Sequence, residues 1–473
     1  MLGLWMFAAA VILLLIGYPV AFSLGGTAVI FTLLGSDLLP NMGVPLPWAP
    51  LFDLDPDLPF RVARLNALPS RIFNIMGNYT LVAVPFFVFM GVMLEKSGLA
   101  EDLLETMGIL FGRLRGGLAL SVVAVGALLA ASTGVVGASV VTMGVLALPV
   151  MLKYNYDKGL ATGVVASSGT LGQIIPPSIV LVILGDQIGV DVGSLFLASF
   201  IPGFMLAGLF MVWVIFVAIT QPKAAPALPA EARTLSGVQL FLRVIKNLIP
   251  PLFLIVLVLG TILIGLATPT EAGAMGAIGA MILAAINRRL NLKNLIATMD
   301  QTVKLTSMVF TILIGATFFS FVFGQLGGAH VVDNFLLNLP GGFYGFIFFT
   351  MLVIFLLGFF IDFIEITFIV VPLIAPIAKQ YLATVYGVDM EHTMMIWFGV
   401  LIAMNLQASF LTPPFGFALF YLKGVAPPSI KTTDIYRGII PFIAIQLIAL
   451  LLIIFFPSIV TFLPSWAASL SSN

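Results

Sequence analysis

The stretch GLALSVVAVGALLAASTGVVGASVVTMGVLALPVML (Gly117–Leu152) contains no charged residue. It is longer than the ~20 residues that one helix needs to cross the hydrocarbon core of a bilayer. Small and hydroxyl-bearing residues gather near its centre, at Ala131–Ser139. Irregular backbone at membrane depth is tolerated only where protein or a watery cavity surrounds it. We therefore predict a helical hairpin over residues 117–152 that enters the membrane and turns back.

The composition of the whole chain supports a membrane protein. Of the 473 residues, 61% are hydrophobic and only 8% are charged, whereas soluble domains carry about 25% charged residues. This excludes a water-soluble enzyme and also a nucleic-acid-binding protein, which needs a basic surface. The chain has no cysteine and only two histidines, and it lacks the phosphate-binding loop of ATPases. We predict an all-helical protein that crosses the membrane many times, with no organic cofactor.

The order of apolar runs suggests two similar halves, joined by the Pro- and Ala-rich segment 221–247. Each half contains one over-long apolar run and then one span that a Pro-Pro pair interrupts. We predict a first half at 1–220 with hairpin 117–152 and broken helix 159–185, a cytoplasmic linker at 221–247, and a second half at 248–473 with hairpin 342–378 and broken helix 393–422.

Further expectations concern the N-terminal part. The run at residues 3–35 is predicted to be one span with a kink at Gly17-Tyr18-Pro19, and residues 72–94 are predicted to be the next span. Residues 36–70 form a loop rich in Pro and Asp. Residues 95–115 mix charged and apolar positions, which is typical of an amphipathic helix at the membrane interface.

The basic residues indicate the orientation. All of them except Arg61, Arg64, Arg71 and Lys379 lie on one side of the predicted spans, and the positive-inside rule makes that side cytoplasmic. If the two hairpins turn back without crossing the membrane, an odd number of membrane crossings separates each element of the first half from its equivalent in the second half. The two halves are then inverted repeats. The N-terminus is then cytoplasmic and the C-terminus periplasmic.

Inverted repeats with discontinuous helices are the architecture of secondary transporters, which bind substrate near the membrane midplane. A broken helix presents free N–H groups on one side of the break and free carbonyl groups on the other. Carbonyl and hydroxyl oxygens suit a small hard cation such as Na⁺, and the N–H groups suit a carboxylate. We therefore expect one ion and one organic anion to bind at the breaks.

The first candidate constellation joins the hairpin centre, Ala131–Ser139, to the motif GQIIPPS at Gly172–Ser178. The second joins FIDFIEIT at Phe360–Thr367 to NLQASFLTPPFG at Asn405–Gly416. The predicted Na⁺ ligands are Ser132, Gly134, Gly137, Gly172, Pro176, Asp362, Thr367, Thr412, Pro413 and Gly416. The residues predicted to bind the substrate are Ser132, Thr133, Gln173, Ser178, Asn405, Gln407 and Thr412.

Each assignment has a structural alternative. Small residues also permit close helix packing in lipid. Asn405 and Gln407 alternatively satisfy nearby broken backbone, and Glu365 alternatively lies in solvent. Asp362 is the stronger acidic candidate, because a charge at the bilayer centre is costly. Glu271 follows Thr268 at the start of an apolar run, a pattern that favours a helix N-terminus over a functional acid.

Five motifs, in order along the chain, resemble a known family: GYPVAFSLG (Gly17–Gly25), PFFVFMGVMLEKSGLA (Pro85–Ala100), GQIIPPS (Gly172–Ser178), TPTEAGA (Thr268–Ala274) and LTPPFG (Leu411–Gly416). The sequence resembles the large, DctM-like membrane subunit of tripartite ATP-independent periplasmic (TRAP) transporters. The resemblance implies a bacterial inner-membrane symporter of organic anions that is driven by Na⁺ and works by an elevator mechanism. It also implies a small four-helix, DctQ-like membrane subunit and a periplasmic, DctP-like substrate-binding protein as partners.

Three alternatives remain at this point. One is a stand-alone ion-coupled symporter of dicarboxylates or other anions that needs no binding protein. The second, a membrane-embedded enzyme, would need a cluster of catalytic side chains at one depth, which the sequence lacks. The third, a purely structural subunit, is disfavoured by the two matched Pro-Pro breaks.

Overall fold

A computed structural model describes residues 2–45, 47–48, 60–133, 136–229, 231, 237–413 and 416–471. Within this part of the chain the regular structure is helical, and the only β-type pairing is an isolated bridge between Ser36 and Phe60. Over the same residues, seven helices are long and apolar enough to cross a membrane, or up to nine if each of two bent helix pairs counts as one span. The prediction of an all-helical, multi-spanning membrane protein is confirmed.

The chain forms two compact units that alternate along the sequence. Unit 1 contains Met1–Tyr79 and Thr306–Glu391, and unit 2 contains Thr80–Leu305 and His392–Asn473. Two helices, α14 (Leu292–Gln325) and α19 (Val388–Phe410), continue across these boundaries.

The other helices of unit 1 come from both of its segments: α1 (Leu2–Ile16), α2 (Val20–Gly35), α3 (Leu38–Asn41), η2 (Val62–Ala67), α4 (Leu68–Met76), α15 (Gly328–Leu337), α16 (Gly342–Leu357), α17 (Phe363–Ile369) and α18 (Val371–Tyr386). Unit 2 holds α5 (Ala83–Lys96), α6 (Leu99–Phe111), α7 (Gly117–Thr133), α8 (Val136–Lys153), α9 (Lys158–Thr170), η3 (Leu171–Gln173), α10 (Ile179–Ile188), α11 (Val192–Thr220), α12 (Gly237–Leu263), α13 (Pro269–Ile286), α20 (Phe417–Val425), α21 (Thr432–Phe455) and α22 (Ser458–Ser471).

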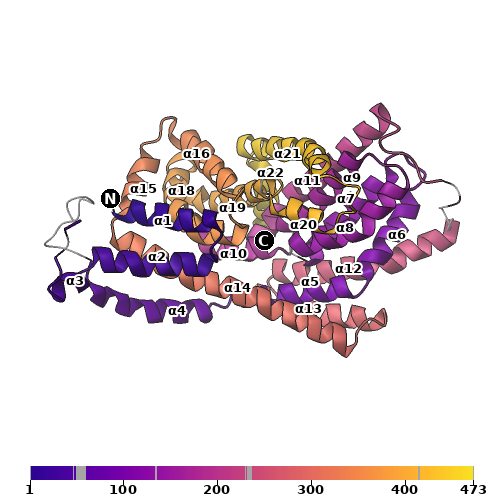
Figure 1. Ribbon diagram of the computed structural model, residues 1–473. Helices are drawn as coiled ribbons and strands as arrows, with labels where there is room; N and C mark the ends of the chain where they lie inside the picture. Colours follow the sequence, from indigo (N-terminus) through magenta and orange to yellow (C-terminus); the bar gives the residue numbers. More distant parts are fainter. Residues whose placement is uncertain are drawn as a thin grey trace. The chain divides into compact units, whose positions relative to one another are not determined.

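The predicted single span at residues 3–35 is two helices. α1 ends at Ile16, α2 begins at Val20, and the two pack against each other (Figure 1). Gly17 permits this reversal because its φ of +95° is strained for a residue with a side chain. Glycine contacts also hold the pair in place: a Cβ at Gly3 would lie 2.6 Å from the Gly328 Cα, and one at Gly315 would lie 2.5 Å from the Ala21 carbonyl oxygen.

The predicted span at residues 72–94 is also different. α4 ends at Met76 and α5 begins only at Ala83, so the segment is interrupted. The next helix, α6, is bent by 58° relative to α5. Gly98 makes this bend with a φ of +76°, a left-handed conformation that glycine adopts at little cost.

The predicted linker at 221–247 is shorter than expected and is tied to its own unit. α12 begins at Gly237, so residues 237–247 are helical. The Ala225 carbonyl accepts a hydrogen bond from Gly116 N at 2.9 Å, and the Ala224 carbonyl accepts one from Asp157 N at 2.9 Å. These two hydrogen bonds connect the segment to the residue before α7 and to the turn before α9.

Tyr156 is the buried residue of that turn, whereas its neighbours Asn155 and Asp157 are exposed. The Tyr156 hydroxyl accepts a hydrogen bond from Leu118 N at 3.3 Å, which joins the α8–α9 turn to the start of α7. Burial raises the pKa of Tyr156 to about 12, so the phenol stays neutral. This hydrogen bond therefore ties the first turn of α7 to the turn that follows α8.

Candidate functional site

The first break interrupts a buried helix. α9 ends at Thr170, the short η3 turn follows, and α10 starts only at Ile179. Pro176 has no N–H to donate to the carbonyl of Gly172, so the α-helical ladder stops here; the Pro176-Pro177 peptide bond is cis. Ser178 Oγ instead donates a hydrogen bond to the Gln173 carbonyl at 2.8 Å. The sequence thus predicted the position of this break.

Polar groups without partners lie at this break. Gln173 is fully buried, and neither its Oε1 nor its Nε2 has a hydrogen-bond partner within the described part of the chain. The hydroxyl of Ser168, one turn earlier, is also buried and unpartnered there. An unmade hydrogen bond at a buried polar group costs about 1–3 kcal/mol. Such groups are normally completed by a ligand or by ordered water.

The second break has a similar construction. α19 ends at Phe410, and Gly416 precedes α20; the predicted motif's Pro414 and Phe415 lie outside the described residues. Thr412 Oγ1 donates to the Ala408 carbonyl at 2.8 Å. Pro413, like Thr412, is half-buried, and Gly416 is buried.

The two predicted amides on α19, Asn405 and Gln407, are both buried. Gln407 repeats the pattern of Gln173, since both of its amide atoms are buried and make no hydrogen bond to any described residue. The alternative that Gln407 satisfies broken backbone therefore finds no support in its contacts.

The first hairpin and parts of both breaks pack together in unit 2. α7 and α8 contact α9 and η3, and α20 contacts α8 and α9 (Figure 1). Glycines allow the close approach: a Cβ at Gly126 would lie 2.6 Å from the Ser168 Cβ, and one at Gly169 would lie 2.4 Å from a Val140 methyl carbon. Folding thus brings elements from both predicted constellations to one place.

The hairpin residues themselves are only partly described. Ser132 and Thr133 occupy the last turn of α7, with side chains outside the described set, and Gly134 lies outside it altogether. Gly137 is in the first turn of α8, where an added Cβ would lie 3.1 Å from the Tyr421 ring. Gly137 thus permits close packing against α20, and its predicted role as an ion ligand stays a prediction.

Asp362 and Thr367 belong to unit 1. Asp362 is the N-cap of α17: its Oδ1 accepts from Phe363 N at 2.6 Å, and Glu365 Oε2 accepts from Asp362 N at 2.9 Å. This reciprocal arrangement is a capping box. Thr367 is buried, and its hydroxyl donates to the Phe363 carbonyl at 2.7 Å. These bonds give all three side chains a local structural role.

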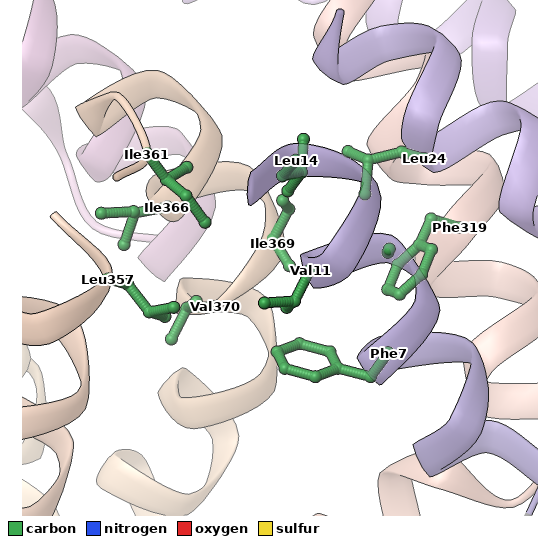
Figure 2. A pocket seen from close by; sticks show the side chains of 11 residues that line it. Phe7, Val11, Leu14, Leu24, Phe319, Leu357, Ile361, Ile366, Ile369 and Val370 are labelled. Carbon is green, nitrogen blue, oxygen red and sulfur yellow. The ribbon is translucent and has the colours of Figure 1, made fainter. Parts of the chain in front are cut away.

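An apolar pocket lies beside that turn. Ile361 and Ile366, which flank the capping box, line it together with side chains of α1, α2, α14 and α16 (Figure 2). All of its lining residues are hydrophobic, so this pocket offers no oxygen to an ion. The predicted partnership of Asp362 and Thr367 with residues 405–416 joins two units and stays a prediction.

Glu271 lies in the first turn of α13, where it has a structural role. Its Oε2 accepts from Thr268 N at 2.8 Å, and Thr268 Oγ1 accepts from Glu271 N at 3.3 Å, which forms the capping box of α13. The expectation of a helix N-terminus at this position is confirmed.

The sequence reasoning missed Gln446 on α21. This side chain is 1% exposed, and both of its amide atoms lack partners among the described residues. α21 runs parallel to α9, because Gly438 touches Gly159 and, one turn on, Phe442 touches Gly163. The same register places Gln446 one turn further along α9, towards the first break. The one sequence feature that could have indicated Gln446 is its position as an amide within an apolar part of α21.

Most of the chain matches one protein family. Residues 7–459 match the family described as "Tripartite ATP-independent periplasmic transporter, DctM component".

Relatives within this family have several different names. The chain is 29% identical to the C4-dicarboxylate TRAP transporter large permease protein DctM of Pseudomonas aeruginosa, over 86% of this chain and 91% of that protein. It is 28% identical to the sialic acid TRAP transporter permease protein SiaT of Haemophilus influenzae, over 93% and 69%. It is 27% identical to the 2,3-diketo-L-gulonate TRAP transporter large permease protein YiaN of Escherichia coli, over 90% and 96%.

A solved structure has the same general fold. The crystal structure of the Alcanivorax borkumensis YdaH transporter, described as having an unusual topology, matches 96% of this chain and 98% of that one, with a TM-score of 0.57 and 12% identity. The relatives are permease subunits rather than enzymes. With a family match over nearly its full length, this chain belongs to the DctM family, the large membrane permease subunits of TRAP transporters.

Proposed function

We propose that this subunit carries out Na⁺-coupled uptake of an organic anion with a carboxylate group. The observation that supports the proposal most directly is the pair of buried, unpartnered amides, Gln173 and Gln407, at two Pro-interrupted helices of one unit. A glutamine amide donates two hydrogen bonds and accepts others. A carboxylate bound there would accept bonds that no described residue accepts.

The substrate class follows from the chemistry of these groups and from the family. A hydrogen bond to a charged group contributes about 1.5–3 kcal/mol, more than one to a neutral group. Neutral amides also bind an anion without adding a fixed charge that would hinder its release. The substrates in the relatives' names are dicarboxylates, sialic acid and 2,3-diketo-L-gulonate, all of them carboxylic acids.

The coupling ion is proposed to bind at the same breaks. Oxygen ligands available there include the Gly172 carbonyl, whose α-helical donor position is taken by Pro176, the Ser409 carbonyl, which accepts from Thr412 N instead of from Pro413, the Thr412 hydroxyl and the serines of the first hairpin. Asp362 and Thr367 remain candidate ligands from the second hairpin. Binding of Na⁺ beside the anion would neutralise charge before the pair crosses the membrane.

The remaining parts of the proposal concern the assembly. The tripartite family implies a small membrane subunit and a periplasmic binding protein that delivers the anion. In the bacterial inner membrane, the hairpins and broken helices would move together as an elevator between the two faces. The inverted repeat, with halves at 1–220 and 248–473, would supply the two alternating gates.

Transport in proteoliposomes tests this function. Liposomes containing both membrane subunits, with the binding protein outside, are given labelled succinate, sialic acid or 2,3-diketo-L-gulonate under an inward Na⁺ or K⁺ gradient. We expect uptake of one of these acids only with Na⁺ and only with the binding protein. Uptake that is equal under both gradients would refute the coupling. Uptake without the binding protein would favour a stand-alone symporter.

Variants connect the result to the site. Gln173→Ala and Gln407→Ala should each reduce uptake strongly. Gln187 on α10 is the matched control, because its Nε2 already donates to Asp186 Oδ2 at 2.8 Å; Gln187→Ala should transport normally. Equal effects at all three positions would argue against a role for the unpartnered amides.

A further inference from the structure

A small cavity lies at the end of α5, beside the first hairpin. Its lining residues are Glu95, Ala100, Leu129, Ala138, Ser139 and Thr142. Leu129 lies near the end of α7, and the last three belong to the first turns of α8. The cavity therefore adjoins the part of the hairpin for which the sequence predicts an ion site made of neutral groups.

Glu95 places a carboxylate in this cavity. Its Oε1 accepts a hydrogen bond from Thr142 Oγ1 at 3.0 Å. Its Oε2 is buried and has no hydrogen-bond partner within the described residues. The ion pairs found in that part of the chain are Arg243–Glu105 and Lys379–Glu391, so Glu95 has no basic partner there. Although the residue as a whole is half-buried, a carboxylate oxygen buried without a partner is costly unless something neutralises its charge.

A monovalent cation meets this need better than a divalent metal. A divalent ion would leave one positive charge uncompensated, and the described residues contain no group of three acidic or histidine side chains that could hold a metal. One carboxylate with nearby hydroxyl oxygens matches the charge and the hard-ligand preference of Na⁺.

We propose that Glu95, together with the hydroxyls of Ser139 and Thr142, forms a Na⁺ site between α5 and the first hairpin. The inference deepens the proposed function, because it gives the neutral hairpin a charged ligand from a different helix. An ion held there joins α8 to α5, so its release would free the hairpin to move. Glu95 belongs to the segment for which the sequence predicted only an interfacial helix.

Thermal unfolding of the full-length chain in detergent tests the site. NaCl replaces choline chloride at constant ionic strength, and the Na⁺ concentration that gives half of the rise in unfolding temperature is measured. We expect Glu95→Gln to raise this concentration by more than about tenfold, since even an indirect partner of a bound metal changes affinity by 10–100-fold. Glu95→Asp should recover part of the response, and Thr142→Val should weaken it with the charge still present.

Glu101→Gln is the matched control, because Glu101 is an exposed carboxylate nearby on α6, and it should leave the Na⁺ response unchanged. A wild-type protein that Na⁺ does not stabilise overturns the site. The site is also overturned if Glu95→Gln leaves the half-maximal Na⁺ concentration unchanged, or if Thr142→Val does so when Glu95→Gln does not fold. If one of these results is found while uptake by the wild-type protein still requires Na⁺, only this inference fails. If uptake ignores Na⁺, the proposed coupling fails.

Discussion

Replacing Gln173 with methionine should make the protein more stable and less active. Methionine has a similar length and shape but no group that needs a hydrogen bond. Gln173 is fully buried with both amide atoms unpartnered among the described residues. The substitution removes an unmet cost of about 1–3 kcal/mol, so the free energy of unfolding of the ligand-free protein should rise by roughly that amount.

The same change should impair transport. A hydrogen bond from the amide to a bound carboxylate contributes about 1.5–3 kcal/mol, which corresponds to a loss of roughly 10- to 150-fold in apparent affinity. Unfolding is measured by SDS titration in mixed micelles without substrate, and affinity by uptake in proteoliposomes. The opposite signs of the two effects distinguish a binding residue from a structural one.

Asn247 is the matched control, because its buried amide has partners. Its Nδ2 donates to Thr106 Oγ1 at 2.8 Å and to the Asp102 carbonyl at 3.3 Å. Asn247→Leu should therefore destabilise the protein by about 1–3 kcal/mol. If Gln173→Met is destabilising to the same extent and leaves uptake unchanged, the amide is structural and our reasoning is wrong.

Two other predictions follow from local structure, and a third follows from the distribution of basic residues. Thr268→Ala removes the N-cap of α13 and should cost about 1 kcal/mol in unfolding free energy with little effect on uptake; a larger loss of uptake would contradict a purely structural role. Gly438→Ala places a Cβ 2.0 Å from a carbonyl oxygen of α9 and should cost about 1–3 kcal/mol, whereas Gly424→Ala, with nothing within 4 Å, should be nearly neutral in the same SDS titration. Because the chain has no native cysteine, Lys223→Cys should react with an impermeant thiol reagent only from the cytoplasm and Asn473→Cys only from the periplasm; the reverse labelling would overturn the orientation.

The positions of the helix breaks could be predicted because their cause is local. A proline lacks the N–H that a helix needs, so the breaks near Pro176 and Pro413 follow directly from the sequence. The helix N-terminus at Glu271 also has a local cause, a threonine followed by an acidic residue, and it could be predicted for that reason.

The errors concern features that distant contacts decide. Residues 3–35 could form a kinked span or a pair of packed helices, and the apolar pattern is the same for both. Packing of Ala21 against Gly315 and of Gly3 against Gly328 favours the pair. These contacts join segments that lie 294 and 325 positions apart in the sequence, and no local pattern reveals them.

The candidate site was only partly predictable for the same reason. Gln173 and Gln407 stood next to recognisable motifs, so they were found. Gln446 and Glu95 have no motif of their own. They become candidates only through their surroundings in the fold. Gln446 lies at an apolar interface with α9, and Glu95 contacts the Thr142 hydroxyl beside a small cavity.

The alternation of the two units along the chain has a consequence for biogenesis. Residues 1–79 leave the ribosome early, but the rest of unit 1, residues 306–391, follows only after all of residues 80–305 have been made. Until then α1 and α2 stand in the bilayer without the surfaces of α14 and α15 against which they pack. The surface of α1 around Gly3 and that of α2 around Ala21 must then be tolerated by lipid or shielded by an insertion factor. Truncation after residue 305 should therefore leave α1 and α2 open to membrane proteases, although residues 80–305 of unit 2 are present.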